Sequence, residues 1–299
     1  MNKDGRTKED IFRQTIMKNI ERKSKYIDQV QTYNDLPIFS WIDVNVTELC
    51  SRTCEFCPRK DPVIYPNQNL HMDLGLGKKI ANELRELSYK GGVIFSGYSE
   101  PLLHPDIQAL VGLFGKDIHT ELVTNGDKLS VKVLRELFSG GLGVLLISMY
   151  DGPQQIEYFQ EMLFEAGVKN EQYVLRDRWY SIEEDYGLKL TNRAGTVKGL
   201  HSQGFATLRP CYYMHYSMQI DWNGDVMLCV QDFSKKIKFG NIYAESLLDI
   251  WNSLNMGKYR KILLKGYRSM FPCNNCNVDG TLHGKNHAEI WKDVYEDKK

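Results

Sequence analysis

The chain has 299 residues, of which 42% are hydrophobic and 25% are charged, an ordinary composition for a globular protein. It carries 38 basic and 38 acidic side chains, so its formal net charge is zero and gives no reason to expect a nucleic-acid or anionic-membrane partner. The longest apolar stretch, around 144–149, is too short to cross a bilayer, and the N-terminus lacks the apolar region of a signal peptide. We therefore expect a cytoplasmic protein that binds neither nucleic acid nor a membrane.

The N-terminal segment is polar, with apolar residues at roughly helical spacing before Pro37 breaks the pattern. These apolar positions include Ile11, Phe12, Ile16 and Ile20. We expect residues 1–36 to form an N-terminal helical extension that packs outside the core. A capping role is favoured over the docking of a partner, because solvated, charged helix faces are common.

Three cysteines follow the first predicted strand, over 41–47, in the segment IDVNVTELCSRTCEFCPRK. Cys50, Cys54 and Cys57 form a CxxxCxxC pattern, which supplies three thiolates from one short loop. A four-iron cluster takes four such ligands, so three leave one iron open for chemistry. The alternative is a zinc site, although zinc usually pairs two CxxC or CxxH knuckles across a longer spacer.

Beyond this loop, predicted helices and strands alternate, which is typical of parallel βα units. The predicted helices cover about 73–89, 106–115, 130–141 and 153–167, and the predicted strands cover 91–97, 119–126, 143–149, 173–178 and 188–194. With the first strand this makes six units, too few for a closed eight-stranded barrel.

Polar side chains follow several of these strands. Glu100 comes after the second strand, Asn125 ends the third, Ser148 ends the fourth, and Arg193 lies in the segment TNRAGTV at the end of the sixth. In parallel βα architectures, ligands bind at the carboxyl ends of the strands. Each residue also has a structural explanation, because polar side chains often cap helices and turns, and an isolated arginine is commonly a surface cation.

The other four cysteines lie in the last third of the chain, at Cys211, Cys229, Cys273 and Cys276. An odd total of seven, clustered at metal-ligand spacings, argues against a disulfide framework. Four thiolates are a full set for a four-iron cluster or for a structural zinc ion, and the spacing leaves both open. Segments 218–221 and 225–228 flank an Asn-Gly pair, which predicts a hairpin, and amphipathic helices follow to about residue 267.

The first cysteine motif resembles that of the radical S-adenosylmethionine (radical SAM) superfamily, in which S-adenosylmethionine chelates the open iron. The resemblance implies that Phe56 lies near the adenine, that Glu100 accepts hydrogen bonds from the ammonium, and that Asn125 binds the ribose. It further implies that Ser148 contacts the cofactor and that Arg193 binds substrate or the cofactor carboxylate. Tyr98-Ser99 stands where the family's GGE motif usually has glycine.

The hairpin and four-cysteine segment resembles the Twitch domain, the shorter relative of the SPASM domain, which houses one auxiliary four-iron four-sulfur cluster. The implied fold is α/β, with a partial (β/α)6 barrel over 37–205 and a small α+β Twitch (SPASM-like) domain over 206–299. The implied cofactors are two 4Fe-4S clusters and S-adenosyl-L-methionine. Within the superfamily, the four-cysteine spacing is similar to that of an aminocyclitol-oxidising dehydrogenase.

In this family, a flavodoxin or ferredoxin-like donor reduces the first cluster, S-adenosylmethionine is cleaved, and the resulting 5′-deoxyadenosyl radical removes a hydrogen atom from the substrate. An auxiliary cluster is suited to accept a second electron. The resemblance therefore implies a dehydrogenase of a hydroxylated small molecule such as a sugar, aminocyclitol or nucleotide sugar. The alternatives are a peptide-modifying enzyme of the same superfamily, an epimerase, and a zinc-stabilised binding module without catalytic activity.

Overall fold

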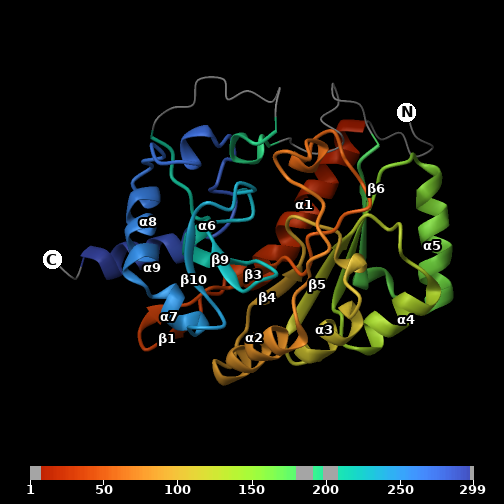
Figure 1. The fold of residues 1–299 in the computed structure, drawn as a ribbon, viewed down its shortest axis with the longest axis horizontal. Helices are drawn as coiled ribbons and strands as arrows, with labels where there is room; N and C mark the ends of the chain where they lie inside the picture. The colour runs from red at the N-terminus through yellow and green to blue at the C-terminus, as the bar shows by residue number, and fades with distance from the viewer. Residues whose placement is uncertain (1–7, 180–190, 198–207, 297–299) are drawn as a thin grey trace.

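The computed structural model describes residues 8–179, 191–197 and 208–296. Its centre is an eight-stranded sheet with the order β10-β9-β8-β3-β4-β5-β6-β7 (Figure 1). Five parallel strands follow the chain order from β3 onward, and they are β3 (Trp41–Val44), β4 (Gly92–Phe95), β5 (His119–Thr124), β6 (Val144–Met149) and β7 (Tyr173–Asp177). The alternation of strands and helices that the sequence predicts is confirmed over this part of the chain.

Four helices connect these strands, and their boundaries follow local capping chemistry. They are α2 (Leu74–Glu86), α3 (Ile107–Phe114), α4 (Val131–Ser139) and α5 (Gln154–Ala166). Asp73 accepts the Leu76 N–H at the start of α2, and Ser130 does the same for Val133 in α4. Helix α5 ends at Gly167, which adopts the left-handed conformation that glycine tolerates best.

Side chains of the sheet alternate between two hydrophobic layers. Ile42 and Val44 join the large core under α2–α5, whereas Trp41 and Ile94 point to the other face. Both faces are therefore covered, which is the usual requirement of a parallel sheet.

Helix α1 (Lys8–Ile27) packs on this second face. The expectation that the N-terminal extension packs outside the core is therefore wrong for the C-terminal end of α1, where Ile27 joins a hydrophobic cluster. Ile27 is fully buried in one cluster with Trp41, and α1 runs behind the strands, across the sheet from α2–α5 (Figure 1). Arg22 also forms an ion pair with the buried Glu121 of β5. Arg22 is one of the charged residues that suggested a solvent-exposed helix, and here the Glu121 carboxylate of the sheet compensates its charge. The short hairpin of β1 (Thr32–Tyr33) and β2 (Leu36–Pro37) links α1 to β3.

The sixth parallel strand is not where the sequence predicts it. Residues 191 and 192 form no strand, Arg193–Gly195 is a turn of 3₁₀ helix, and 188–190 lie outside the described residues. Instead, β8 (Ser217–Ile220) pairs in parallel with β3, on the side away from β4. The first strand of the C-terminal hairpin therefore continues the barrel sheet.

The C-terminal region builds on this shared edge. Strand β9 (Asp225–Met227) pairs antiparallel with β8, which confirms the predicted hairpin, and β10 (Lys238–Asn241) adds the last strand. The helices are α6 (Tyr213–Tyr216), α7 (Leu247–Trp251), α8 (Leu254–Leu264) and α9 (Lys285–Glu296). The domain boundaries at 36 and 205 stay a prediction.

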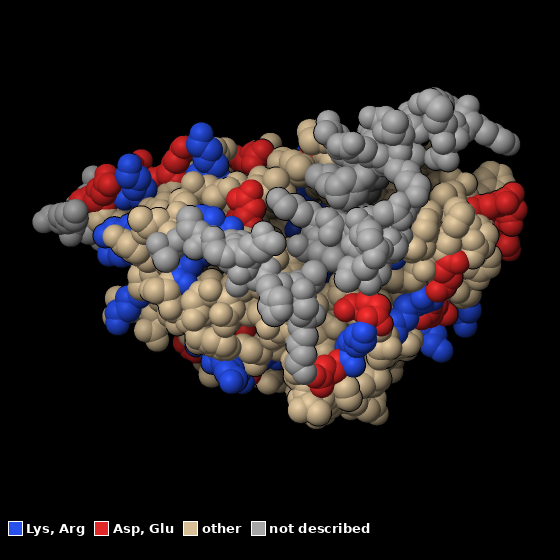
Figure 2. Space-filling view, turned by 90° about the horizontal axis from the view of Figure 1, so that it is seen from above, with Lys and Arg blue, Asp and Glu red and all other residues tan. Residues whose placement is uncertain are grey.

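Basic and acidic side chains are interspersed on the face shown in Figure 2, which agrees with a formal net charge of zero. Within the described residues, no helix is both long enough and apolar enough to cross a membrane.

Candidate active site and metal centres

The first cysteine loop leaves the sheet directly after β3. Burial raises the pKa of Cys50 and raises that of Cys54 to about 12. The neighbouring thiols, Cys57 and then Cys50, raise the Cys54 pKa further, so the three sulfur atoms lie within electrostatic reach of one another. Three partly buried thiols held this close together favour a cationic metal group that would compensate the charge of their thiolates.

Polar contacts attach this loop to the ends of β5 and β6. Ser51 donates to the Asp127 carboxylate at 2.8 Å, and Arg52 donates to Asp127 at 2.6 Å and to Asp151 at 2.7 Å. These hydrogen bonds hold the Arg52 pKa above its ordinary value, with Asp151 as the largest cause. The three-thiol set is therefore fixed at the carboxyl edge of the sheet, where a ligand is expected.

Glu100 lies buried between this loop and β5. Its carboxylate accepts Thr124 Oγ1 and the Asn125 N–H, both at 2.7 Å, and the Leu102 N–H at 3.1 Å. Burial nevertheless outweighs these hydrogen bonds and raises the pKa of Glu100 to about 7. The carboxylate caps the 3₁₀ turn Pro101–Leu103, so the capping explanation holds for this side chain. A further role toward an amino group stays a prediction.

The other predicted cofactor contacts gather around the same loop. Asn125 donates through Nδ2 to Ser51 Oγ at 2.9 Å, and its Oδ1 accepts the Asp127 N–H at 3.0 Å. Phe56 stacks against Tyr150 with ring centroids 6.2 Å apart, just beyond the end of β6. Ser148 accepts a hydrogen bond from Arg176 Nη2 at 2.7 Å. Chain segments far apart in the sequence thus meet around Cys50–Cys57.

Arg193 is grouped instead with the second cysteine set. Its Nη1 donates to Gln231 Oε1 at 3.3 Å, and its guanidinium carbon lies 5.6 Å from the ring centroid of Phe233. Both partners follow Cys229, so Arg193 faces the loop of an auxiliary ligand. Burial is the main cause that lowers the pKa of Arg178, just after β7, to about 9, and the charge of Arg193 contributes less.

The four C-terminal cysteines converge from three segments. Cys211 precedes α6, Cys229 follows β9, and Cys273 begins the 3₁₀ turn that ends before Cys276. Burial raises the pKa of Cys229 well above its ordinary value, and the thiols of Cys273, Cys276 and Cys211 raise it further. The tertiary structure thus brings the four thiols, the four-thiol set, within electrostatic reach of one another.

The sequence analysis missed several arginines that hold the two sites together. Arg268 donates to the carbonyl oxygens of Arg209, Pro210 and Val278, so it joins the chain before Cys211 to the chain after Cys276. A lone arginine has no motif that predicts such a role. Arg52 lies inside the CxxxCxxC pattern, and its place between two cysteines was the one available signal.

Among the described residues, no three Cys, His, Asp or Glu side chains gather as they would around a single metal ion. The metal assignment is decided by comparison with known families.

Two family models match the chain. The radical SAM superfamily model matches residues 44–169, and an iron-sulfur cluster-binding (SPASM) domain model matches residues 211–277. The chain thus carries a radical SAM domain followed by an iron-sulfur cluster-binding domain. The first match contains the three-thiol loop and the second contains the four-thiol set, so the cofactors of this radical SAM enzyme are S-adenosylmethionine and iron-sulfur clusters.

Known proteins resemble this radical SAM enzyme over most of its length. The S-adenosyl-L-methionine-dependent 2-deoxy-scyllo-inosamine dehydrogenase of Niallia circulans is 29% identical over 245 residues, which are 80% of this chain and 93% of the relative. The crystal structure of BtrN in complex with AdoMet and 2-DOIA matches with a TM-score of 0.69 and 27% identity, covering 84% of this chain and 98% of BtrN. BtrN in an open conformation matches with a TM-score of 0.61 and 24% identity, covering 82% and 97%. The predicted partial barrel with a SPASM-type domain is confirmed.

Proposed function

We propose that this radical SAM oxidoreductase is a dehydrogenase that oxidises one secondary alcohol of an aminocyclitol or a similar hydroxylated ring. The observation that carries the proposal is the joining of a three-thiol set and a four-thiol set to one continuous sheet. The similarity to a 2-deoxy-scyllo-inosamine dehydrogenase along 93% of that relative supports the substrate class.

Cys50, Cys54 and Cys57 would hold the cluster that binds S-adenosylmethionine, and the four C-terminal cysteines would hold the auxiliary cluster. When bound, these groups supply hydrogen-atom abstraction from carbon and an acceptor for one electron. Oxidation of a secondary alcohol to a ketone removes one hydrogen atom from carbon, one electron, and one proton from the hydroxyl. The group held by the three-thiol set would serve the loss of the hydrogen atom, and the group held by the four-thiol set would accept the electron.

The surrounding side chains bind and orient. Ser148 and Arg176 form a hydrogen-bonded pair, and the buried Arg176 Nε has no hydrogen-bond partner among the described residues. We assign this pair to the carboxylate of S-adenosylmethionine, because a guanidinium binds a carboxylate through paired, charge-assisted hydrogen bonds. Glu100 and Asn125 are assigned to its amino group and its ribose, and Phe56 to its adenine.

Arg193 is assigned to the substrate. Arg193 lies beside Gln231 and Phe233, which belong to the loop that carries Cys229. This position favours contact between its guanidinium and the substrate hydroxyl that is oxidised. A guanidinium stays charged and donates hydrogen bonds, so it would stabilise negative charge on that oxygen as its proton leaves. A flavodoxin or ferredoxin-like protein is proposed as the electron donor.

Serine substitutions separate the two sites. Anaerobically reconstituted protein should contain about eight irons. Serine at Cys50, Cys54 and Cys57 should abolish formation of 5′-deoxyadenosine. Serine at Cys273 and Cys276 should spare that cleavage but prevent oxidation of 2-deoxy-scyllo-inosamine, followed as the ketone by mass spectrometry. Ketone formation that survives loss of the second set would overturn the proposed role of the auxiliary cluster.

A further inference from the structure

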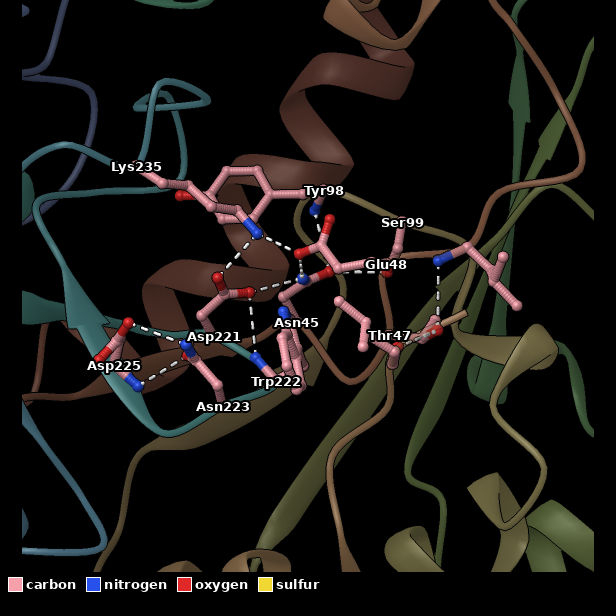
Figure 3. A network of polar contacts seen from close by, with 12 residues as sticks. Asn45, Thr47, Glu48, Tyr98, Ser99, Asp221, Trp222, Asn223, Asp225 and Lys235 are labelled. Carbon is pink, nitrogen blue, oxygen red and sulfur yellow. Dashed lines mark hydrogen bonds and ion pairs between the residues drawn. The ribbon is translucent and has the colours of Figure 1, made fainter. Parts of the chain in front are cut away.

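One continuous set of polar contacts connects the first cysteine loop with the loop that carries Cys229. We call it the bridging network, and it consists of Glu48, Arg59, Tyr98, Asp221 and Lys235. Figure 3 labels all of these residues except Arg59, and they converge from the segments that follow β3, β4, β8 and β9. Both ends of the network reach the backbone of a cysteine.

The first end is at Cys50. Asn67 accepts the Cys50 N–H at 2.9 Å and donates to the Cys50 carbonyl at 3.2 Å, so it holds both backbone polar groups of this ligand. Arg59 donates to Asn67 Oδ1 at 3.2 Å. The same guanidinium donates to the carbonyl of Tyr98 and lies 3.5 Å from Glu48.

The second end is at Cys229. The Tyr98 hydroxyl donates to the Cys229 carbonyl at 3.1 Å. The Tyr98 ring is 1% exposed and packs edge-on against Phe233, with centroids 4.7 Å apart. Tyr98 therefore links the two ligand loops, because its carbonyl accepts from Arg59 while its hydroxyl donates to Cys229.

Lys235 joins the two ends electrostatically. Its Nζ contacts Glu48, lies 2.7 Å from Asp221 Oδ2, and lies 4.7 Å from the centroid of the Tyr98 ring. Lys235 has a φ of +51°, a left-handed conformation that a lysine adopts at an energetic cost. The two carboxylates of the network match its two cations, and all except Lys235 are at most 5% exposed. Removing one charge would leave a buried partner uncompensated.

We propose that the bridging network is a positioning device that sets the auxiliary ligand loop relative to the first cysteine loop. Tyr98 and Lys235 act as positioning residues through Cys229 and do not touch the reacting atoms. This inference rests on the proposed function, because a fixed separation matters when an electron must pass from the substrate to the auxiliary cluster. A shifted loop would let S-adenosylmethionine cleavage continue while oxidation fails.

The test is Tyr98→Phe, which deletes one hydroxyl and keeps the packed ring. Tyr89→Phe is the matched control, because the buried Tyr89 hydroxyl also donates to a carbonyl, that of Gly92 at 3.2 Å, at the opposite end of the sheet. We expect Tyr98→Phe to keep both clusters, to cleave S-adenosylmethionine at the wild-type rate, and to lower ketone formed per 5′-deoxyadenosine by about threefold or more. The control should keep the wild-type ratio.

The second readout is the electron paramagnetic resonance spectrum of the reduced auxiliary cluster, recorded with Cys50, Cys54 and Cys57 replaced by alanine so that only this cluster contributes. Tyr98→Phe should change this spectrum and Tyr89→Phe should not. An unchanged spectrum with an unchanged product ratio, or equal changes in both variants, overturns the proposal. This readout needs no substrate, so a wild-type enzyme that fails to oxidise aminocyclitols would overturn the proposed function separately.

If the Tyr98→Phe variant loses the auxiliary cluster, two substitutions of Lys235 test the proposal instead. Lys235→Arg keeps the charge and should keep the wild-type spectrum, whereas Lys235→Met should change it. Lys238→Met is the control, because Lys238 forms a more exposed ion pair with Asp225 on the neighbouring strands. Equal behaviour of Lys235→Arg and Lys235→Met would overturn the proposal.

Discussion

Arg52 and Asp127 form a two-pronged ion pair between the first cysteine loop and the end of β5. Arg52 Nη2 donates to Asp127 Oδ1 at 2.6 Å, and Arg52 Nε donates to Oδ2 at 3.0 Å. A second carboxylate, Asp151, binds the other edge of the same guanidinium. The loop therefore approaches the sheet in one orientation, because a planar fork that binds two carboxylates fixes direction as well as distance.

Arg52→Lys should weaken the first cluster selectively, because lysine keeps the charge but cannot bind two carboxylates in a plane. We expect the affinity for this cluster to fall by about tenfold or more, as for other residues that orient metal ligands. Iron and sulfide analysis after limiting reconstitution checks this. Arg85→Lys, at the exposed pair with Asp117, is the control and should leave the iron content unchanged. Equal iron loss in both variants would contradict the prediction.

Glu100 should make binding of S-adenosylmethionine depend on pH. Burial raises the pKa of Glu100 to about 7, so the folded protein keeps this proton between about pH 4.5 and 7 while the unfolded chain loses it. The stability that this bound proton gives the folded protein is fully present below about pH 4.5 and is lost as the pH rises through about 7. If the carboxylate accepts the cofactor's amino group, affinity should rise over the same interval.

Equilibrium binding measured between about pH 6 and about pH 8 tests this, with a slope approaching tenfold per pH unit below the pKa of Glu100. Glu100→Gln cannot titrate and should flatten the profile. A Glu100→Gln profile that matches the wild type would exclude Glu100 as the titrating group.

Arg22→Met should destabilise the fold, because it leaves the fully buried Glu121 carboxylate without its cation. His119 lies 3.1 Å from Glu121, but burial lowers the His119 pKa to about 4, so at neutral pH it supplies no charge. We expect a loss of about 3 kcal/mol. The double variant with Glu121→Met should recover more than half of it.

The midpoint of chemical denaturation measures this effect. Lys132→Met, which removes an exposed pair with Glu136 on α4, should change stability by at most about 0.5 kcal/mol. A Lys132→Met loss as large as that of Arg22→Met would show that burial of the pair is irrelevant.

Gly280→Ala should displace an auxiliary ligand. A Cβ at this position would lie 2.7 Å from Cys211 Sγ, and the φ of +67° disfavours any side chain. We expect loss of auxiliary iron with the first cluster retained, measured by iron analysis and paramagnetic resonance. Gly257→Ala in α8, where a Cβ meets no atom within 4 Å, is the control. Retention of all iron by Gly280→Ala would refute this assignment.

The sequence by itself indicated the first metal centre. Three cysteines in a CxxxCxxC loop needed only their spacing to indicate an iron-sulfur site, because ligands close in sequence stay close in space. The four later cysteines indicated a second metal centre, but their spacing did not distinguish a cluster from zinc. The period of apolar residues likewise predicted strands β3–β7 and the hairpin, since a core-facing side recurs at a fixed interval.

Only the tertiary structure decided how these parts join. Strand β8 pairs with β3 although more than half of the chain separates the two strands, and no local pattern predicts which edge a strand will choose. For the same reason, the packing of α1 on the second face of the sheet and the contact of Tyr98 with Cys229 could not be predicted from the sequence. Long-range pairings depend on the summed burial and charge balance of distant segments, and these quantities exist only once the chain has folded.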